Sequence, residues 1–223
     1  MTEETAATRY FDLIIAIVNI GKASRVLEEG RKKGITGGTI SIGHGTISSQ
    51  LLRKLGLLEV RKEVLFMVSE RSYTLPVIDH LAEVLHLHEP NKGIIFSTAL
   101  SGVLGTQGEC LDLDKTDTVQ PTTHELFVSI VPAEMSDQII EAVRLAGGAG
   151  GTILHGHSAF NETTQKVFGI EIDAEKEMIL NLVEKNLADQ IEKTLVEQVQ
   201  QHAEEKTLLF SMDAQHVRGI YQK

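Results

Sequence analysis

The chain has 223 residues, of which 42% are hydrophobic, 23% charged and only 4% aromatic, a composition typical of a soluble globular protein with aliphatic cores. The net charge of −10 argues against a nucleic-acid partner, because binding to phosphates needs a cationic surface. A single cysteine (Cys110), a polar N-terminus and the absence of a long apolar run predict a cytoplasmic protein with no internal disulfide, signal peptide or membrane span.

One sequence unit occurs twice along the chain. Asp12–Val18 reappears as Glu125–Val131, and Gly37–His44 reappears as Gly150–His157. A duplicated unit predicts two domains of the same fold.

The first repeat predicts alternating strands and helices. Phe11–Val18 is an almost unbroken aliphatic run, typical of a central strand covered on at least one face. A helix follows between Gly21 and Gly34, whose basic end and closing glycine are typical stop signals. The next expected elements are a strand at Thr39–Ile42, a short helix at Leu51–Leu58, a strand at Arg61–Ser69, a helix opened by Pro76 and a strand at Gly93–Ala99.

The second repeat predicts the same order, with a longer second helix. That helix would be too long to cover one small sheet, so its outer half is expected to contact another domain or chain. The expected strands lie near Glu125–Val131, Gly151–His155, Lys166–Ile172 and Thr207–Met212, and the helices near Glu134–Ala146 and Ala174–Ala203.

Each repeat therefore has the order strand–helix–strand–strand–helix–strand, which is the split βαβ pattern of the ferredoxin-like fold. The predicted fold class is α+β, with two tandem ferredoxin-like domains that have antiparallel sheets. We place the first domain at 9–105, a linker at 106–123 and the second domain at 124–223.

Two segments carry a family resemblance. Ile15–Lys22 (IAIVNIGK) and Gly34–Thr46 (GITGGTISIGHGT) resemble the PII nitrogen-regulatory signal proteins, in particular their divergent PII-like branch. The resemblance covers nearly all of 10–105 and, more weakly, 124–220. It implies ferredoxin-like cores that assemble as a threefold ring, a nucleotide in the cleft between neighbouring cores, and a mobile loop that contacts a protein partner.

On this chain the resemblance places the loop at Gly43–Glu59 and a phosphate-contacting turn at about Pro90–Gly93. The chain departs from the family pattern at that turn, because Ile94 stands where the family has a lysine, and the modifiable tyrosine of the loop is absent. Glycines would permit close backbone approach, Thr46 would donate a hydroxyl hydrogen bond and Lys92 would supply charge to an anion such as an adenine nucleotide. The candidate ligand-binding residues are Gly37, Gly38, Thr39, Gly43, His44, Gly45, Thr46, Lys92 and Gly93.

Histidines provide an alternative site. His155 and His157 stand two residues apart in a predicted strand, so both imidazoles would face one side and could bind one borderline metal ion; His44 is the first-repeat counterpart of His157. Loop-base histidines that only make hydrogen bonds are the more common case.

Other motifs indicate no catalysis. Gly147–Gly151 ends a helix and opens a strand, which is the reverse of a phosphate loop, so it predicts a turn. No nucleophile stands in a recognisable elbow, and the acidic residues lie on helix faces.

The sequence therefore predicts a non-enzymatic, cytoplasmic, oligomeric PII-like protein of nitrogen regulation. It would sense a small-molecule effector and signal to a protein partner through the loop 43–59. Two alternatives stay open: a metal-binding or metal-tolerance protein that uses the duplicated Gly-His loops, and a purely structural oligomer.

Overall fold

The computed structural model describes residues 10–46, 59–101, 103, 122–157, 165–167, 170–172, 175–202 and 207–220. The predicted helix at Leu51–Leu58 and most of the predicted linker lie outside these residues. The chain divides into two compact units, each of which combines parts of both repeats.

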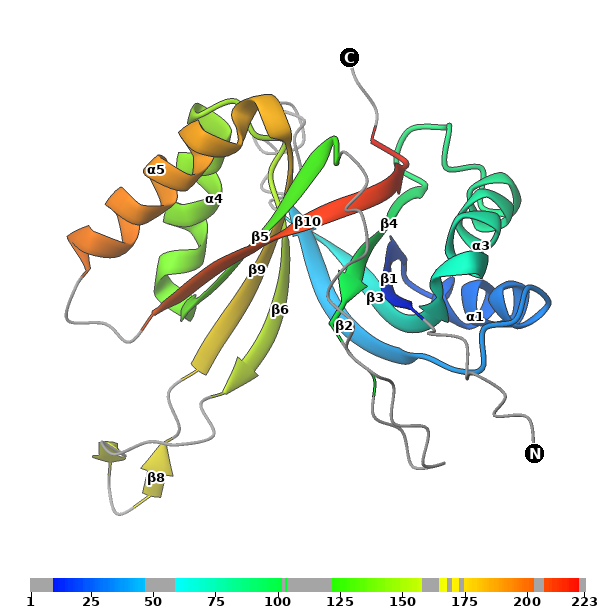
Figure 1. Ribbon diagram of the computed structural model, residues 1–223. Coiled ribbons are helices and arrows are strands. Elements are labelled where there is room, and N and C mark those ends of the chain that lie inside the picture. Colours follow the sequence, from blue (N-terminus) through cyan, green and yellow to red (C-terminus); the bar gives the residue numbers. More distant parts are fainter. Residues whose placement is uncertain are drawn as a thin grey trace, which may run out of the picture. The chain divides into compact units, whose positions relative to one another are not determined.

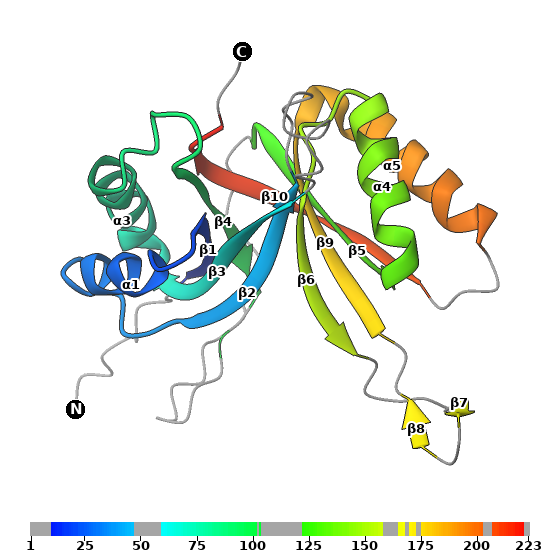
Figure 2. The same cartoon turned by 180° about the vertical axis from the view of Figure 1, so that it is seen from behind.

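The first unit comprises Met1–Ile40, Glu63–Thr122 and Ala214–Lys223. Helices α1 (Ala23–Arg31) and α3 (Arg71–Val84) lie next to each other beside β1 (Phe11–Asn19) and β3 (Glu59–Glu70) in both views (Figures 1 and 2). The elements of this unit are β1, α1, α3 and β4 (Gly93–Leu100), together with most of β3, the start of β2 (Thr39–Thr46) and the end of β10 (Leu208–Arg218).

Strand β1 is the centre of this unit. Its aliphatic run Ile14–Val18 is buried throughout, as a strand with both faces covered requires. Alternate residues of the run join one core with the apolar faces of the two helices. That core contains Ile14, Ala16, Val18, Ala23, Val26, Ile35, Leu65, Met67, Val77, Ile78, Leu81, Leu87 and Ile95.

The second unit comprises Ser41–Lys62 and Thr123–Asp213. Helices α4 (Ser136–Leu145) and α5 (Lys185–Gln201) lie together over β5 (His124–Pro132), β9 (Glu175–Glu184) and β6 (Thr152–His157) (Figure 2). Phe127, Ile153 and Ile179 pack beneath them with the helix residues Ile139 and Ile191. The elements of this unit are β5, α4, β6, β9 and α5, together with η1 (Ala133–Met135), β7 (Gln165–Val167), β8 (Ile170–Ile172), the larger part of β2 and the starts of β3 and β10.

The prediction of two separate ferredoxin-like sheets is wrong. Among the described residues, the eight long strands form one hydrogen-bonded series, β1-β3-β2-β6-β9-β5-β10-β4, and antiparallel pairing of β4 with β1 closes it as a barrel. The four outer strands of two ferredoxin-like sheets pair instead of remaining edges: β2 with β6, and β10 with β4. Pairing is favoured because an edge strand leaves a row of N–H and C=O groups without partners.

Glycines allow these strands to approach closely. A Cβ on Gly43 would lie 2.5 Å from the carbonyl oxygen of Ile153 on β6. A Cβ on Gly219 would collide with the carbonyl oxygen of Gly93, at the start of β4, and the φ of +91° at Gly219 is itself one that side chains rarely adopt. The glycines are therefore part of the strand pairing.

The predicted helix Ala174–Ala203 is wrong in its first third. Residues Glu175–Glu184 form β9, which pairs with both β5 and β6, and the helix begins only at Lys185. The flanking charges resemble a helix surface, but Met178–Val183 is apolar except at Asn181, and a central strand buries such a segment. The predicted strand Lys166–Ile172 is replaced by β7 and β8, which pair with each other.

None of the described helices combines the length and apolarity needed to cross a membrane.

Gly93 provides a test of the local backbone. Its φ is +138°, and a Cβ there would lie 2.6 Å from the carbonyl oxygen of Ile17. We expect Gly93→Ala to lower the free energy of unfolding by at least about 2 kcal/mol in chemical denaturation, because strain and overlap add. Gly37→Ala is the control, since nothing lies within 4 Å of its Cβ position. If both variants lost the same free energy of unfolding, backbone strain and overlap at Gly93 would not be the cause.

Candidate functional site

The residues predicted to bind a ligand fall into two groups, one in each unit. Thr39 opens β2 just after Gly37 and Gly38, and Gly93 opens β4 just after Lys92, all in the first unit. The other predicted residues belong to the second unit, and these are Gly43, His44, Gly45 and Thr46.

Thr46 ties the end of β2 to β6. Its hydroxyl donates to the carbonyl of Gly151 and accepts the N–H of the same residue, both at 3.0 Å, and its own N–H donates to that carbonyl at 3.0 Å. The hydroxyl predicted to meet a ligand therefore already fixes the strand register. Residues 47–58 of the predicted loop lie outside the description; β2 ends at Thr46 and β3 begins at Glu59.

Lys62, which the sequence did not single out, lies beside this strand end. Its Cε and Cγ would each be 3.1 Å from a Cβ on Gly45, so its stem covers the glycine. Burial lowers the pKa of the Lys62 ammonium. A half-buried cation thus stands in the same unit as Gly45 and Thr46.

His44 and His155 lie in one hydrogen-bonded chain with Glu177. His155 Nε2 is 2.8 Å from His44 Nδ1, and its other nitrogen, Nδ1, is 2.8 Å from Glu177 Oε1. The two rings meet edge to face, with centroids 4.9 Å apart. His157 pairs with Glu175 in the strand register, and its side chain lies outside the description, so its predicted metal role stays a prediction.

The strand register explains why these three side chains meet. His155 stands directly opposite Glu177 on β9, and His44 on β2 stands opposite Ile153, two residues before His155. Residues two apart in a strand share a face, so His44, His155 and Glu177 lie on the same side of the sheet. Glu177 was missed because the strand that carries it was predicted as helix.

The turn before β4 is closed by its own contacts. Lys92 Nζ lies 3.0 Å from Glu89 Oε2, and this hydrogen bond lowers the pKa of Glu89. Asn91 adopts a φ of 63°, and its carbonyl accepts a 3.0 Å hydrogen bond from the Asn19 side chain. The charge predicted to meet a phosphate therefore pairs with a surface carboxylate.

The N-terminus of α1 has an internal acceptor. Glu63 Oε2 accepts the N–H groups of Lys22 and Ala23 at 2.9 and 2.8 Å. Burial opposes ionisation of Glu63, but these backbone hydrogen bonds outweigh it and lower its pKa. The carboxylate therefore occupies the place where a bound anion would meet this helix.

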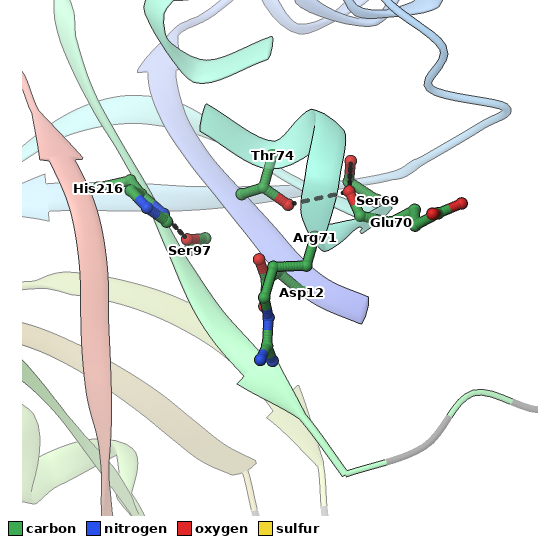
Figure 3. Close-up of polar contacts among 7 residues, drawn as sticks. All are labelled: Asp12, Ser69, Glu70, Arg71, Thr74, Ser97 and His216. Carbon is green, nitrogen blue, oxygen red and sulfur yellow. Dashed lines mark hydrogen bonds and ion pairs between the residues drawn. The ribbon is translucent and has the colours of Figure 1, made fainter. Parts of the chain in front are cut away.

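A second polar cluster lies inside the first unit (Figure 3). Asp12 is fully buried and accepts a 3.0 Å hydrogen bond from Arg71 Nε, while its Oδ2 has no hydrogen-bond partner in the described part of the chain. Ser97 Oγ lies 3.0 Å from His216 Nδ1, and His216 has a φ of 52° where the register of β10 shifts.

The Asp12–Arg71 pair has a counterpart in the second repeat. Glu125, the duplicate of Asp12, accepts a 2.7 Å hydrogen bond from Lys185, which opens α5 as Arg71 opens α3. The backbone N–H of Arg71 also donates to the carbonyl of Tyr10, just before β1. In the same way, the backbone N–H of Lys185 donates to the carbonyl of Thr123, just before β5. Because both copies keep this acid–base pair, its role is to hold the first strand of the repeat to its second helix. An alignment of the two copies could have revealed the pair from the sequence.

No protein-family model matches the chain, and no curated protein matches it either. Among solved structures, the PII protein of Arabidopsis thaliana with bound citrate is similar over 44% of this chain and 82% of its own, at 24% identity and a TM-score of 0.36. GlnK of B. subtilis is similar over 47% of this chain and 97% of its own (17% identity, TM-score 0.37), and its ATP complex gives 19% identity over 44% and 90%, with a TM-score of 0.35. At these TM-scores the similarities do not establish a function for this chain.

The partly buried His216 predicts a pH dependence of stability. Burial, the largest cause, lowers the pKa of His216 and outweighs the attraction of Asp12. The unfolded chain, with a histidine pKa of about 6.5, then binds more protons than the folded one, so the stabilisation is complete above about pH 6.5 and is lost as the pH falls through the lower folded pKa.

We expect His216→Asn to flatten this decline between about pH 7 and 5 in urea titrations, because asparagine tolerates a positive φ but does not titrate. His124, whose pKa is also lowered by burial, leaves a residual slope in the variant. His88→Asn is the control, since the His88 side chain is 72% exposed. If the stability of His216→Asn fell with pH as steeply as that of wild type, His216 would not be the cause of the decline.

Proposed function

We propose that the protein is a non-enzymatic PII-like signalling protein that binds a small anionic effector and signals through the segment 43–59. The family part of this proposal rests on the resemblance carried by Ile15–Lys22 and Gly34–Thr46. The observation that carries its mechanism is the fixed end of β2, where Thr46 makes three hydrogen bonds to Gly151.

The end of β2 suits transmission of a binding event. The strands on either side of the segment, β2 ending at Thr46 and β3 beginning at Glu59, are neighbours in the hydrogen-bonded order. An effector that competes for the Thr46 hydroxyl or the Gly151 N–H would change the position from which the segment starts. A ligand with different affinity for the two arrangements shifts their populations, and partner affinity follows.

An anionic effector fits the charges near the predicted residues. Lys62 is a half-buried lysine beside Gly45, and burial lowers its pKa because the ammonium has lost contact with water. An anion bound next to this ammonium would stabilise its charged form. Lys92 is 43% exposed, and its pair Glu89 is 46% exposed, so a phosphate could replace that carboxylate at little cost. The two lysines lie in different units, and each is tested by itself.

The serine–histidine pair of the first unit supports a non-enzymatic role. Ser97 has no exposed surface, so its hydroxyl does not face solvent from which a substrate could arrive. Nucleophilic catalysis needs the nucleophile and its base to reach a bound substrate.

The proposal predicts saturable nucleotide binding by the intact protein. Calorimetric titrations with ATP, ADP, AMP and cyclic AMP, each with and without 2-oxoglutarate and Mg²⁺, should show binding in the micromolar range for at least one of them. Lys62→Met, which keeps the aliphatic stem over Gly45, should weaken that binding about tenfold or more, as should Lys92→Ala if the turn contacts phosphate.

Lys32→Ala is the matched control, because Lys32 pairs with Glu29 on the surface of α1 just as Lys92 pairs with Glu89. An equal loss in this variant would point to net charge alone. The absence of heat with every nucleotide would refute nucleotide sensing and leave the two alternatives, the metal-binding protein and the structural oligomer.

A further inference from the structure

The hydrogen-bonded chain of His44, His155 and Glu177 brings two imidazoles and a carboxylate together. All three residues belong to the second unit, and they come from three neighbouring strands, β2, β6 and β9. Neither the resemblance nor the proposed effector site accounts for Glu177, and the His155 side chain is 53% exposed and open to solvent.

Glu177 fixes the orientation and tautomer of His155. A carboxylate accepts but does not donate hydrogen bonds when ionised, so Nδ1 of His155 carries the proton that lies between them, at 2.8 Å. In the neutral ring, Nε2 then presents its lone pair toward His44 Nδ1, also 2.8 Å away. A carboxylate behind a ligating histidine is the usual means by which proteins orient the ring and raise its basicity.

The spacing of the two nitrogens suits a shared ion. Metal–nitrogen bonds of about 2.0–2.1 Å in tetrahedral geometry place two ligand nitrogens about 3.3 Å apart. The two nitrogens therefore need to separate by about half an ångström from their hydrogen-bonded positions, and the rings must turn so that both lone pairs point at the ion. His44 would bind in the tautomer that carries its proton on Nε2.

The backbone holds both ligands in place. Gly43 lets β2 approach β6, since a Cβ there would lie 2.5 Å from the Ile153 carbonyl oxygen. The pairs Gly43↔Leu154 and His44↔Ile153 then set the register that brings His44 to His155. Ligands on paired strands are positioned more firmly than ligands on loops.

We propose that His44 Nδ1 and His155 Nε2 bind one divalent transition-metal ion of borderline softness, with Glu177 orienting His155 and water completing the coordination. Imidazole nitrogen is a preferred ligand of Zn²⁺, Ni²⁺ and Cu²⁺. The proposal goes beyond the anionic effector, because it concerns a ligand of another class and needs neither Lys62 nor Lys92.

Another histidine cluster is the natural comparison. His86, His88 and Glu89 have ligand atoms within 4.8 Å of one another, all on exposed residues. Glu89 is already held by the Lys92 ammonium at 3.0 Å, which places a cation where the ion would bind. That cluster therefore serves as the control for nonspecific binding by surface histidines.

The test is a calorimetric titration of the full-length protein with ZnCl₂ and NiCl₂. We expect one ion per chain, with affinity reduced at least tenfold by His44→Ala and by His155→Ala, and about tenfold by Glu177→Gln. His86→Ala and His88→Ala should bind like wild type. Unchanged binding in His44→Ala and His155→Ala, loss in the control variants, or no binding to wild type would each overturn the site.

Side-chain nitrogen spectra of ¹⁵N-histidine-labelled wild type provide a readout that does not depend on variants. Zinc should shift the resonances of His44 Nδ1 and His155 Nε2, while His155 Nδ1 keeps its proton against Glu177. A shift confined to other histidines would contradict the assignment. Nucleotide titration of the same samples keeps the two proposals separate, because Lys62→Met should retain the metal and His155→Ala should retain the nucleotide.

Discussion

Pairing of strands that would otherwise be edges is the constraint on which the rest of this structure depends. β2 pairs with β6 in one unit, and the end of β10 pairs with β4 in the other. Each pairing supplies partners for backbone groups that an isolated sheet would leave exposed. Each also brings together residues from the two repeats, so Thr46 meets Gly151 and His44 meets His155. Both candidate sites at the end of β2 are consequences of this pairing.

Comparison of the two repeats separates contacts that both copies keep from contacts that differ between them. The acid–base pairs Asp12–Arg71 and Glu125–Lys185 join the first strand to the second helix in both copies. Another duplicated carboxylate has diverged: counted back from the residue that opens the second helix, Glu177 corresponds to Glu63. Glu63 caps α1, whereas Glu177 binds His155. A carboxylate that contacts different groups in the two repeats marks a position where a new function is expected to have arisen.

The sequence predicted local features well and long-range ones poorly. The aliphatic run from Phe11 and the strand from Gly93 were found within a residue or two, because burial of a continuous apolar run is a local signal. β9 was predicted as helix, since its charged flanks resemble a helix surface and only its two neighbours make it a strand. The duplicated histidines were found, but their partners depend on register across strands far apart in the sequence, which periodicity does not encode.

Amide hydrogen exchange of a chain truncated after Asp213 tests the strand pairing most directly. The deleted residues are the end of the second repeat in sequence but belong to the first unit, beside β4. The structure predicts that protection is lost mainly in Gly93–Leu100 and its neighbours, while β5 and β9 stay protected. Unchanged protection of β4, with losses confined to β5 and β9, would show that each repeat folds as a separate sheet and would contradict the account.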